Sequence, residues 1–334
     1  MLFAHATMSG AHVFVDRSQF PGNVRRDLQA SLRARAIAHK FHYESYKQAA
    51  KWLALHEACS PARRDESCRR IYEQAFASVS AASLGPGGIH VVGLGCGGGQ
   101  KEARLIETLK GNHDAIRYTA CDVSLPLVLA AQEAAQRLVT ESCSHCIVCD
   151  LGTTTGLRDQ LDAINTSQGR LVTLFGIIPN FEPIPLLTRI ASLLRPDDSL
   201  LLSANLAPGD DYPAGVEKVL PQYDNELTRD WLLTLLLDLG FERDDGEICF
   251  GIECDAQGLR RIVAHFEIRR PRDLRVEGEA MHFGGGERVR LFFSYRHTPE
   301  TIRGLLASQR LELKGEWLNE TGEEAVFLCR KVHP

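Results

Sequence analysis

The stretch Gly93-Leu94-Gly95-Cys96-Gly97-Gly98-Gly99-Gln100-Lys101 decides the fold of this 334-residue chain. It follows an apolar run at residues 89–92 and leads into an amphipathic segment at residues 102–109. A strand, a glycine turn and a helix N-terminus let backbone N–H groups approach a nucleotide closely. The spacing Gly93-x-Gly95-x-x-Gly98 fits a dinucleotide fingerprint, but the same turn serves enzymes that use S-adenosylmethionine (SAM). The motif alone therefore leaves the nucleotide open.

Strand-like and helix-like segments alternate on both sides of this turn, with short links between them. The expected strands are 88–94, 117–122, 145–150, 170–176 and 198–204. The expected helices are 100–110, 125–139, 156–164 and 184–194. This alternation predicts a doubly wound α/β sheet that is parallel and has helices on both faces. Near the C-terminus, a strand at 311–318, a Gly322 turn and a strand at 325–331 predict an antiparallel hairpin, which is typical of class I SAM methyltransferases.

Changes of pattern divide the chain into four parts. Residues 1–85 read as helical, and the breaker cluster Gly85-Pro86-Gly87-Gly88 marks their end. The expected parts are an N-terminal helical part of a substrate region (1–85), a Rossmann-like SAM-binding core (86–205), an inserted α+β substrate-binding region (206–287) and a C-terminal completion of the core (288–334). We expect the first and third parts to fold together over the carboxyl ends of the strands, where ligands of doubly wound sheets bind.

Composition argues against several classes of protein. The formal net charge is −5 and 24% of residues are charged, so we expect no nucleic-acid partner. The basic residues of 63–70 are interrupted by acidic ones and read as a solvated helix face. No stretch approaches the roughly 18–20 apolar residues of a membrane span, and no signal peptide is evident. We therefore expect a cytoplasmic protein that acts on a small molecule, with its oligomeric state left open.

Ten cysteines without secretory signals are typical of reduced thiols. The cluster Cys143-x-x-Cys146-x-x-Cys149 resembles part of an iron–sulfur run, but a fourth cysteine at the expected offset is absent. The segment 145–150 also reads as a buried strand, in which cysteine is a small hydrophobe. We predict no metal site.

Two carboxylates at expected strand ends bear on the choice of nucleotide. Asp122 can accept hydrogen bonds from both hydroxyls of a ribose, although NAD enzymes use the same device and Asp122 could instead cap the next helix. Asp150 can accept from an adenine amino group while Leu151 packs on the ring, unless Asp150 is only a helix cap. Together with the C-terminal hairpin, these residues favour SAM.

Four motifs, in order and at comparable spacing over residues 35–334, resemble the histidine-specific SAM-dependent methyltransferase family. They are Gly95-x-Gly97-x-x-x-Lys101, Asp122-Val-Ser124, Ile178-Pro-Asn-Phe181 and Ser294-Tyr-x-x-Thr-Pro-Glu300. The best-known member of the family trimethylates the α-amine of histidine, and a fungal branch methylates prenylated tryptophan. The resemblance implies a SAM-dependent methyltransferase that releases S-adenosylhomocysteine (SAH).

The resemblance also implies roles for individual residues. Tyr43 would close over SAM, Lys101 would pair with its methionine carboxylate, and Asp122 would hold the ribose. The expected cofactor-binding residues are Tyr43, Gly93, Gly95, Gly97, Lys101, Asp122, Val123, Asp150 and Leu151. For lysines in general, a solvated position is the commoner case. The first-turn position of Lys101, beside helix N–H groups, favours carboxylate binding.

The same resemblance places the acceptor beside Asn180, Tyr223 and Ser294. Asn180 would orient the amine or carboxylate, Tyr223 would line the pocket, and Ser294 would help read the acceptor ring. The expected catalytic residues are Asn180 and Tyr223, and the expected substrate-binding residues are Asn180, Tyr223, Phe292 and Ser294. A turn asparagine, a core tyrosine and a strand serine are the alternatives in which these residues are only structural.

One departure separates this chain from the histidine enzyme. Phe292 stands where that enzyme carries the glutamate that pairs with imidazole, and a buried donor left unpaired costs about 1–3 kcal/mol. We therefore expect the acceptor to be the amine of an amino acid or derivative other than histidine. Histidine N-α-methylation is the alternative within the class. A non-catalytic SAM-binding protein and an NAD(P)-dependent oxidoreductase are the alternatives outside it.

Overall fold

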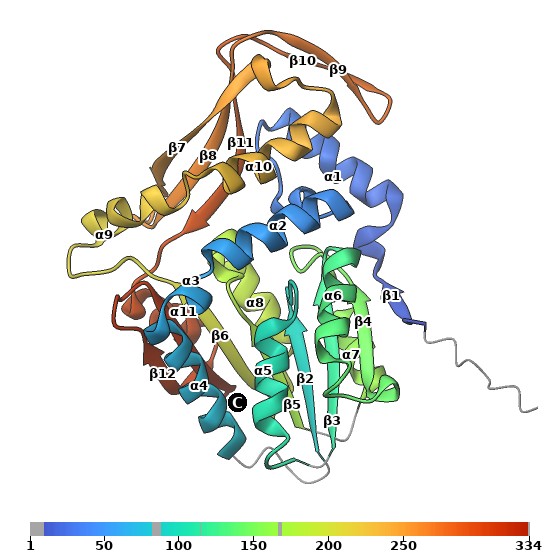
Figure 1. Cartoon of the computed structure of the whole chain (residues 1–334), viewed down its shortest axis with the longest axis vertical. Coiled ribbons are helices and arrows are strands. Elements are labelled where there is room, and N and C mark those ends of the chain that lie inside the picture. The colour runs from blue at the N-terminus through green and yellow to red at the C-terminus, as the bar shows by residue number, and fades with distance from the viewer. Residues whose placement is uncertain (1–9, 82–87, 114, 166–168, 333–334) are drawn as a thin grey trace, which may run out of the picture.

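An eight-stranded sheet forms the base of the molecule (Figure 1). In this computed structural model the described residues are 10–81, 88–113, 115–165 and 169–332. The strand order is β1-β4-β3-β2-β5-β6-β13-β12. The strands of this sheet are β1 (Val13–Val15), β2 (Ile89–Leu94), β3 (Ile116–Asp122), β4 (Ser144–Val148), β5 (Gly169–Leu174), β6 (Ser199–Asn205), β12 (Leu311–Leu318) and β13 (Glu324–Lys331).

The first six of these strands along the chain, β1 to β6, pair in parallel, and the last two are antiparallel. β13 runs antiparallel to β6, and β12 runs antiparallel to β13. This is the doubly wound sheet with a C-terminal hairpin that the alternation predicted. One strand was not expected: β1, within the part that reads as helical, pairs with the edge strand β4.

Helices cover both faces of the large sheet (Figure 1) and bury one apolar core on each. On one face lie α4 (Glu66–Ala81), α5 (Gln100–Leu109) and α6 (Leu125–Ala135). On the other face lie α7 (Leu157–Ile164), α8 (Pro183–Leu193) and α11 (Pro299–Ser308). Parallel strands buried on both faces are nearly continuous in apolar residues, and all six residues of β2 are buried.

A smaller α+β region lies above the carboxyl ends of the parallel strands (Figure 1). Its strands are β7 (Gly246–Cys254), β8 (Arg260–Ile268) and β11 (Arg288–Tyr295), in the order β11-β8-β7, beside a hairpin of β9 (Arg272–Val276) and β10 (Glu279–Phe283). Its helices are α1 (Pro21–Arg33), α2 (Tyr46–Cys59), α3 (Pro61–Arg64), α9 (Tyr212–Val219) and α10 (Glu226–Leu239). Apolar residues of α1, α10 and the small sheet share one core, so the N-terminal and inserted parts pack together.

The structure changes one expected boundary. β11, which we assigned to the C-terminal completion of the core, pairs antiparallel with β8 and therefore belongs to the small sheet. A core completion needs pairing with β6 or β13, and β11 makes neither. The boundary expected at 85/86 lies outside the described residues. Gly240 ends α10 with φ of 105°, as expected of a glycine stop.

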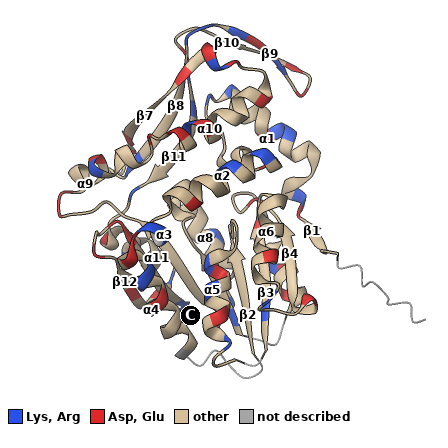
Figure 2. Ribbon diagram, viewed as in Figure 1, with Lys and Arg blue, Asp and Glu red and all other residues tan. Residues whose placement is uncertain are grey.

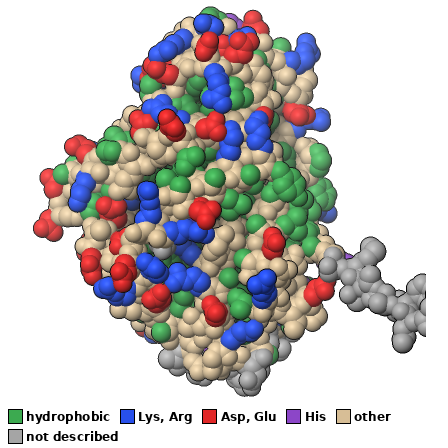
Figure 3. Space-filling view, viewed as in Figure 1, with side chains coloured by type: hydrophobic (Ala, Val, Ile, Leu, Met, Phe, Trp, Pro, Cys, Tyr) green, Lys and Arg blue, Asp and Glu red, His purple; other side chains and the backbone are tan. Residues whose placement is uncertain are grey.

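Charged side chains of both signs are intermixed over the ribbon (Figure 2), in keeping with the small net charge. Basic side chains gather on the viewed face over α3 and α4 (Figure 3). Arg63, Arg64, Arg69 and Arg70 are exposed there, and Arg70 pairs with Glu320 at 2.9 Å. No helix within the described ranges is both long and apolar enough to cross a membrane.

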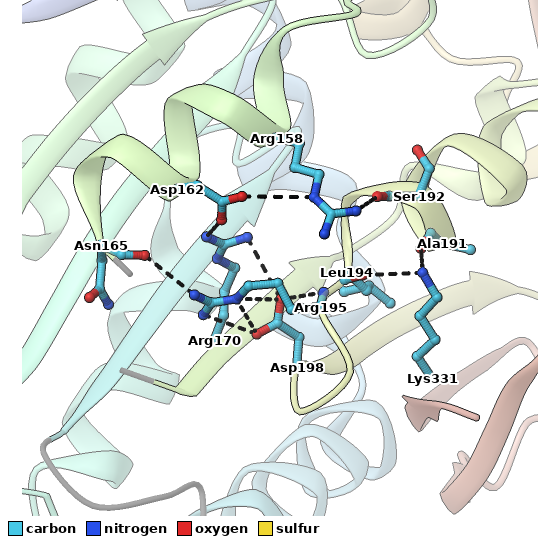
Figure 4. A network of polar contacts seen from close by, with 10 residues as sticks. All are labelled: Arg158, Asp162, Asn165, Arg170, Ala191, Ser192, Leu194, Arg195, Asp198 and Lys331. Atoms are coloured by element: carbon cyan, nitrogen blue, oxygen red, sulfur yellow. Dashed lines mark hydrogen bonds and ion pairs between the residues drawn. The ribbon is translucent and has the colours of Figure 1, made fainter. Parts of the chain in front are cut away.

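A network of ion pairs and hydrogen bonds lies near the amino ends of β5 and β6 (Figure 4). The guanidinium of Arg170, whose residue is 1% exposed, lies 2.7 Å from a carboxylate oxygen of Asp162 and 3.7 Å from one of Asp198. Asp198, also buried, accepts from the backbone N–H of Arg195 at 2.8 Å and pairs with its guanidinium at 3.2 Å. Each buried charge at this end therefore faces a charge of opposite sign within the protein.

Candidate active site

A cavity of about 550 Å³ lies between the carboxyl ends of the large sheet and the small region above it. Its floor is the glycine turn after β2 and the ends of β3, β4 and β5. Its roof is the segment 38–43 and α2, which contribute Tyr43, Trp52 and His56. The cavity is within the size range of small-molecule sites, and it lies where doubly wound sheets bind ligands.

The glycine turn is shaped by the absence of side chains. Gly95 and Gly97 have φ of 62° and 52°, a left-handed conformation that glycine adopts readily. A Cβ at Gly95 would lie 2.3 Å from Cδ1 of Ile177, and one at Gly97 would lie 2.7 Å from the ring of Trp52. The turn therefore needs glycine here, both for its backbone and for the close packing of Trp52.

Asp122 ends β3 at the edge of the glycine turn. Its Oδ2 accepts from the backbone N–H of Gly97 and its Oδ1 from that of Ser124, both at 3.0 Å. Burial raises the pKa of Asp122 to about 6 although these hydrogen bonds oppose the rise. A carboxylate held this firmly at the cavity wall can accept from ribose hydroxyls, and Ser124, not Asp122, caps α6.

Asp150 follows β4 and is held from two sides. Its Oδ1 accepts from the backbone N–H of Gly152 at 2.8 Å, and its Oδ2 lies 3.0 Å from Nζ of Lys40. The same Nζ lies 2.6 Å from Asp27 on α1. Leu151, Phe181 and Leu186 form apolar wall beside Asp150, which suits a flat ring.

Lys101 lies in the first turn of α5 and lines the cavity. Its Nζ donates to the hydroxyl of Tyr72 at 2.6 Å and lies 3.6 Å from Glu324 on β13. Lys101 is therefore not a freely solvated lysine. It presents a positive charge at the cavity wall while it is anchored to the C-terminal strand.

Asn180 lies in a short 3-10 turn after β5, at the cavity wall. Its Nδ2 donates to the backbone oxygen of Phe293 at 3.2 Å and lies 3.4 Å from Nδ1 of His39. The His39 ring packs edge-on against Phe293 with centroids 4.8 Å apart. Burial lowers the pKa of His39 to about 3, so the ring is neutral near pH 7.

Most of the expected cofactor residues come together at this cavity. The predicted site residues that line it are Tyr43, Gly95, Gly97, Lys101, Asp122, Val123, Asp150, Leu151 and Asn180. Four others do not line it: Gly93, Tyr223, Phe292 and Ser294.

Tyr223 and Ser294 contact each other instead. The Tyr223 hydroxyl lies 2.8 Å from Oγ of Ser294 and accepts from the Arg296 guanidinium at 2.7 Å. Phe292 is buried in the core shared with α10. Successive side chains along β11 point to opposite faces of the small sheet. A register shift between Arg290 and Phe292 decides which residues point to which face. As a result Phe293 faces the cavity, where we expected Phe292 and Ser294.

Sequence reasoning missed many of the lining residues, among them His39, Lys40, Trp52, His56, Glu102 and Phe293. Trp52 and His56 are four apart on α2 and stack with centroids 5.1 Å apart, so a helical face after Tyr43 was a usable signal. His39 and Lys40 are polar residues next to that tyrosine. The register shift that exposes Phe293 left no signal that we could read.

The residues present fit SAM. A glycine cradle that any Cβ would fill, a buried carboxylate at the second strand end and an apolar slot beside Asp150 match its parts.

Comparison with known proteins agrees. The family described as "Histidine-specific methyltransferase, SAM-dependent" matches residues 64–331. The chain belongs to this family. It is a SAM-dependent methyltransferase, which excludes the dinucleotide and non-catalytic alternatives considered from the sequence.

Individual relatives are distant. A histidine N-alpha-methyltransferase of Mycobacterium tuberculosis (strain CDC 1551 / Oshkosh) is 25% identical over 288 residues, covering 81% of this chain and 82% of that protein. A solved SAM-dependent methyltransferase from Clostridium acetobutylicum has a TM-score of 0.45 at 12% identity, over 85% of this chain and 99% of that one. The magnesium protoporphyrin IX methyltransferase of Synechocystis, solved with SAH, has a TM-score of 0.43 at 15% identity, over 86% and 95%.

Proposed function

We propose that the enzyme methylates the amine of a small amino acid or amino-acid derivative other than histidine. One observation carries the proposal: the Asn180 amide meets the cavity beside neutral His39 and Phe293, so β11 presents an apolar ring and no carboxylate to the acceptor. The ten cysteines are all free thiols, which supports a reducing compartment such as the cytoplasm.

The cofactor would be held by the lining residues already described. Asp122 accepts from the ribose, Asp150 and Leu151 border the adenine, and Lys101 faces the methionine carboxylate. Tyr43 is partly buried and packs against Trp52 and Trp231, with ring centroids 5.8 and 5.5 Å away, in the roof of the cavity. When bound, SAM supplies an electrophilic methyl group.

Asn180 is the residue that orients the acceptor. Its amide nitrogen is committed to the Phe293 carbonyl, so the amide oxygen is left to accept from the acceptor's N–H. A reacting nitrogen must be held about 3–3.5 Å from the methyl carbon, in line with the bond that breaks. Tyr223 and Ser294, bonded to each other behind this wall, support β11 rather than touch the acceptor.

The acceptor nitrogen needs a lone pair, so an ammonium must lose a proton before transfer. Burial in the cavity favours the neutral amine, because low polarity lowers the pKa of an ammonium. His39 is too weak a base, with its pKa near 3, to hold that proton. The proton is therefore released to solvent rather than to His39.

The ring of Phe293 suits an acceptor with a flat part. The guanidiniums of Arg261 and Arg290 lie 5.2 and 5.5 Å from this ring, but both pair with Glu253, at 2.8 and 3.6 Å, and neither lines the cavity. Strand β11 presents no carboxylate that could pair with the ring N–H of histidine.

A screen with methyl-labelled SAM tests the proposal. Purified enzyme is incubated with histidine and with a panel of aromatic and aliphatic amino acids and their amines, and label is followed into product. We expect transfer to a non-histidine amine. Preferential turnover of histidine, or transfer to oxygen acceptors alone, would overturn the proposal.

An Asn180→Ala variant separates acceptor binding from cofactor binding. We expect kcat/KM for the acceptor to fall at least tenfold, because the variant loses one hydrogen bond to a group that becomes charged in the transition state. The affinity for SAH should stay unchanged. Asn112→Ala, in a loop after α5, is the matched control and should behave as wild type.

Histidine N-α-methylation is the second candidate. It is favoured by the relative from M. tuberculosis, which carries that activity by name. The same screen decides between the two candidates.

A further inference from the structure

A buried carboxylate that none of the preceding roles uses faces the cavity beneath the glycine turn. Glu102, in the first turn of α5, is 3% exposed and lines the cavity. Its Oε1 accepts from the hydroxyl of Thr173, at the end of β5, at 3.0 Å. It therefore reaches from the helix to the strand ends, next to where the methionine part of SAM would lie.

The chain makes room for this side chain. A Cβ at Gly93 would lie 3.1 Å from Cγ of Glu102 and 3.4 Å from its Oε1. Gly93 does not line the cavity and has ordinary strand pairing. The missing side chain at Gly93 thus leaves the space under the turn to the Glu102 carboxyl.

Glu102 has no cationic partner within ion-pair distance among the residues that the structure describes. Lys101, its neighbour, pairs with Glu324 instead, and none of the ion pairs among the described residues includes Glu102. A buried carboxylate without a counter-charge is unfavourable. Burial accordingly raises its pKa to about 7. At the other end of the sheet, Asp198 is equally buried but is paired with arginines.

We propose that Glu102 binds the α-ammonium group of the cofactor's methionine part, so that Lys101 and Glu102 together recognise the amino-acid zwitterion. An ammonium supplies the counter-charge and the hydrogen bonds that Glu102 lacks. Lys101 and Glu102 have opposite charges, as do the carboxylate and ammonium groups that are bonded to the α-carbon of the methionine part. The inference rests on SAM being the cofactor and is independent of which acceptor is methylated.

Three ligands dissect the site without any catalytic turnover. SAH has both the ammonium and the carboxylate, its decarboxylated analogue S-(5′-adenosyl)-3-thiopropylamine keeps only the ammonium, and 5′-methylthioadenosine has neither. Calorimetry measures their dissociation constants for wild type, Glu102→Gln and Glu107→Gln. Glu107 is exposed on the same helix and is the matched control.

We expect Glu102→Gln to weaken SAH and the thiopropylamine at least tenfold and to leave 5′-methylthioadenosine unchanged. Unchanged binding of 5′-methylthioadenosine also shows that the variant is folded. Equal weakening of all three ligands, or wild-type affinity for SAH, would overturn the proposal. A failed acceptor screen would leave this result intact, so the two proposals fail separately.

Proton release gives a second readout. Groups facing Glu102 are Lys101 on its own helix, Asp122 on β3, Cys96 in the turn and Tyr118 within the sheet. A bound ammonium stabilises the ionised carboxyl, so SAH binding near pH 7 should release a fraction of a proton. Glu102→Gln should reduce that release to the smaller part that Asp122, with a pKa of about 6, contributes, and an unchanged release would contradict the assignment.

Discussion

Two buried carboxylates at the carboxyl ends of the large sheet, unlike those at its amino ends, have no cationic partner among the described residues, although Asp150 beside them pairs with Lys40. At the amino ends of β5 and β6, Arg170 lies between Asp162 and Asp198, and Arg195 closes the set (Figure 4). At the carboxyl ends, Asp122 is held by backbone N–H groups and Glu102 by a hydroxyl, and neither has a cationic partner among the described ion pairs. The first arrangement stabilises the fold, and the second leaves charge for a ligand to complete.

The largest expected effect is on stability at the amino ends. Asp198→Asn leaves the buried Arg170 with Asp162 as its remaining counter-charge among the described residues, so we expect the free energy of unfolding to fall by about 3 kcal/mol, the lower end of the range for a broken buried pair. Denaturant unfolding measures it. The affinity of the folded variant for SAH should not change, and a variant as stable as wild type would contradict the contrast.

The same substitution at the other end should act on binding. Asp122→Asn removes the acceptor of the ribose hydroxyls, and we expect SAH affinity to fall about 10- to 100-fold, as for loss of hydrogen bonds to a charged group. Asparagine relieves the burial of a charge but keeps only one of the two backbone hydrogen bonds, so we expect the free energy of unfolding to change less than in Asp198→Asn. A loss of stability with retained affinity would reverse our assignment of the two ends.

Two glycines sharpen the contrast within the cavity end. Gly95→Ala forces a left-handed alanine and sets its Cβ against Ile177, whereas Gly209→Ala, in the loop after β6 and away from the cavity lining, meets the same backbone strain with nothing within 4 Å. Left-handed backbone costs an alanine about 1–2 kcal/mol. We expect both variants to lose this stability in thermal unfolding. Only Gly95→Ala should also lose SAH affinity, and equal affinities would show that the turn tolerates a shift of Ile177.

The smallest effect concerns pH. Burial holds the pKa of Asp122 near 6, above its ordinary value, so the ionised acceptor is lost as pH falls through 6. The affinity for 5′-methylthioadenosine, which has the ribose but no ammonium, should then weaken by up to about tenfold per pH unit below 6. The Asp122→Asn variant should show a flat profile, and a wild-type profile that is flat between pH 5 and 7 would contradict the assignment.

The sequence allowed prediction of the large sheet because its pattern is local. Apolar runs, glycine turns and Asp122 at a strand end placed β2 to β6 within a few residues of their observed bounds. The small sheet was only partly predicted. The sequence indicates β-rich segments at 260–270 and 287–296, which correspond to β8 and β11, whereas β7 and the β9–β10 hairpin were not predicted. β1 was missed because three residues carry too little pattern.

The candidate site divides in the same way. Residues on the glycine turn and the strand ends follow from spacing, and they meet at the cavity. Phe292, Ser294 and Tyr223 depend on the phase of one strand, and a single register shift turned Phe293 inward in their place. His39 and Trp52 reach the cavity through tertiary packing of the N-terminal part, which no local pattern encodes.

The contacts that anchor Lys101 have a consequence for how the enzyme folds. The two partners of Lys101, Tyr72 and Glu324, are hydrogen-bonded to each other and lie 252 positions apart in the sequence. Lys40 and Asp150, which both line the cavity, are 110 positions apart. Contacts this distant in sequence form late, since long loops must close first. A nascent chain that lacks β13 has the glycine turn but not the partner that fixes Lys101. Competence to bind the cofactor should therefore arrive only with the last strand, as one of the final events of folding.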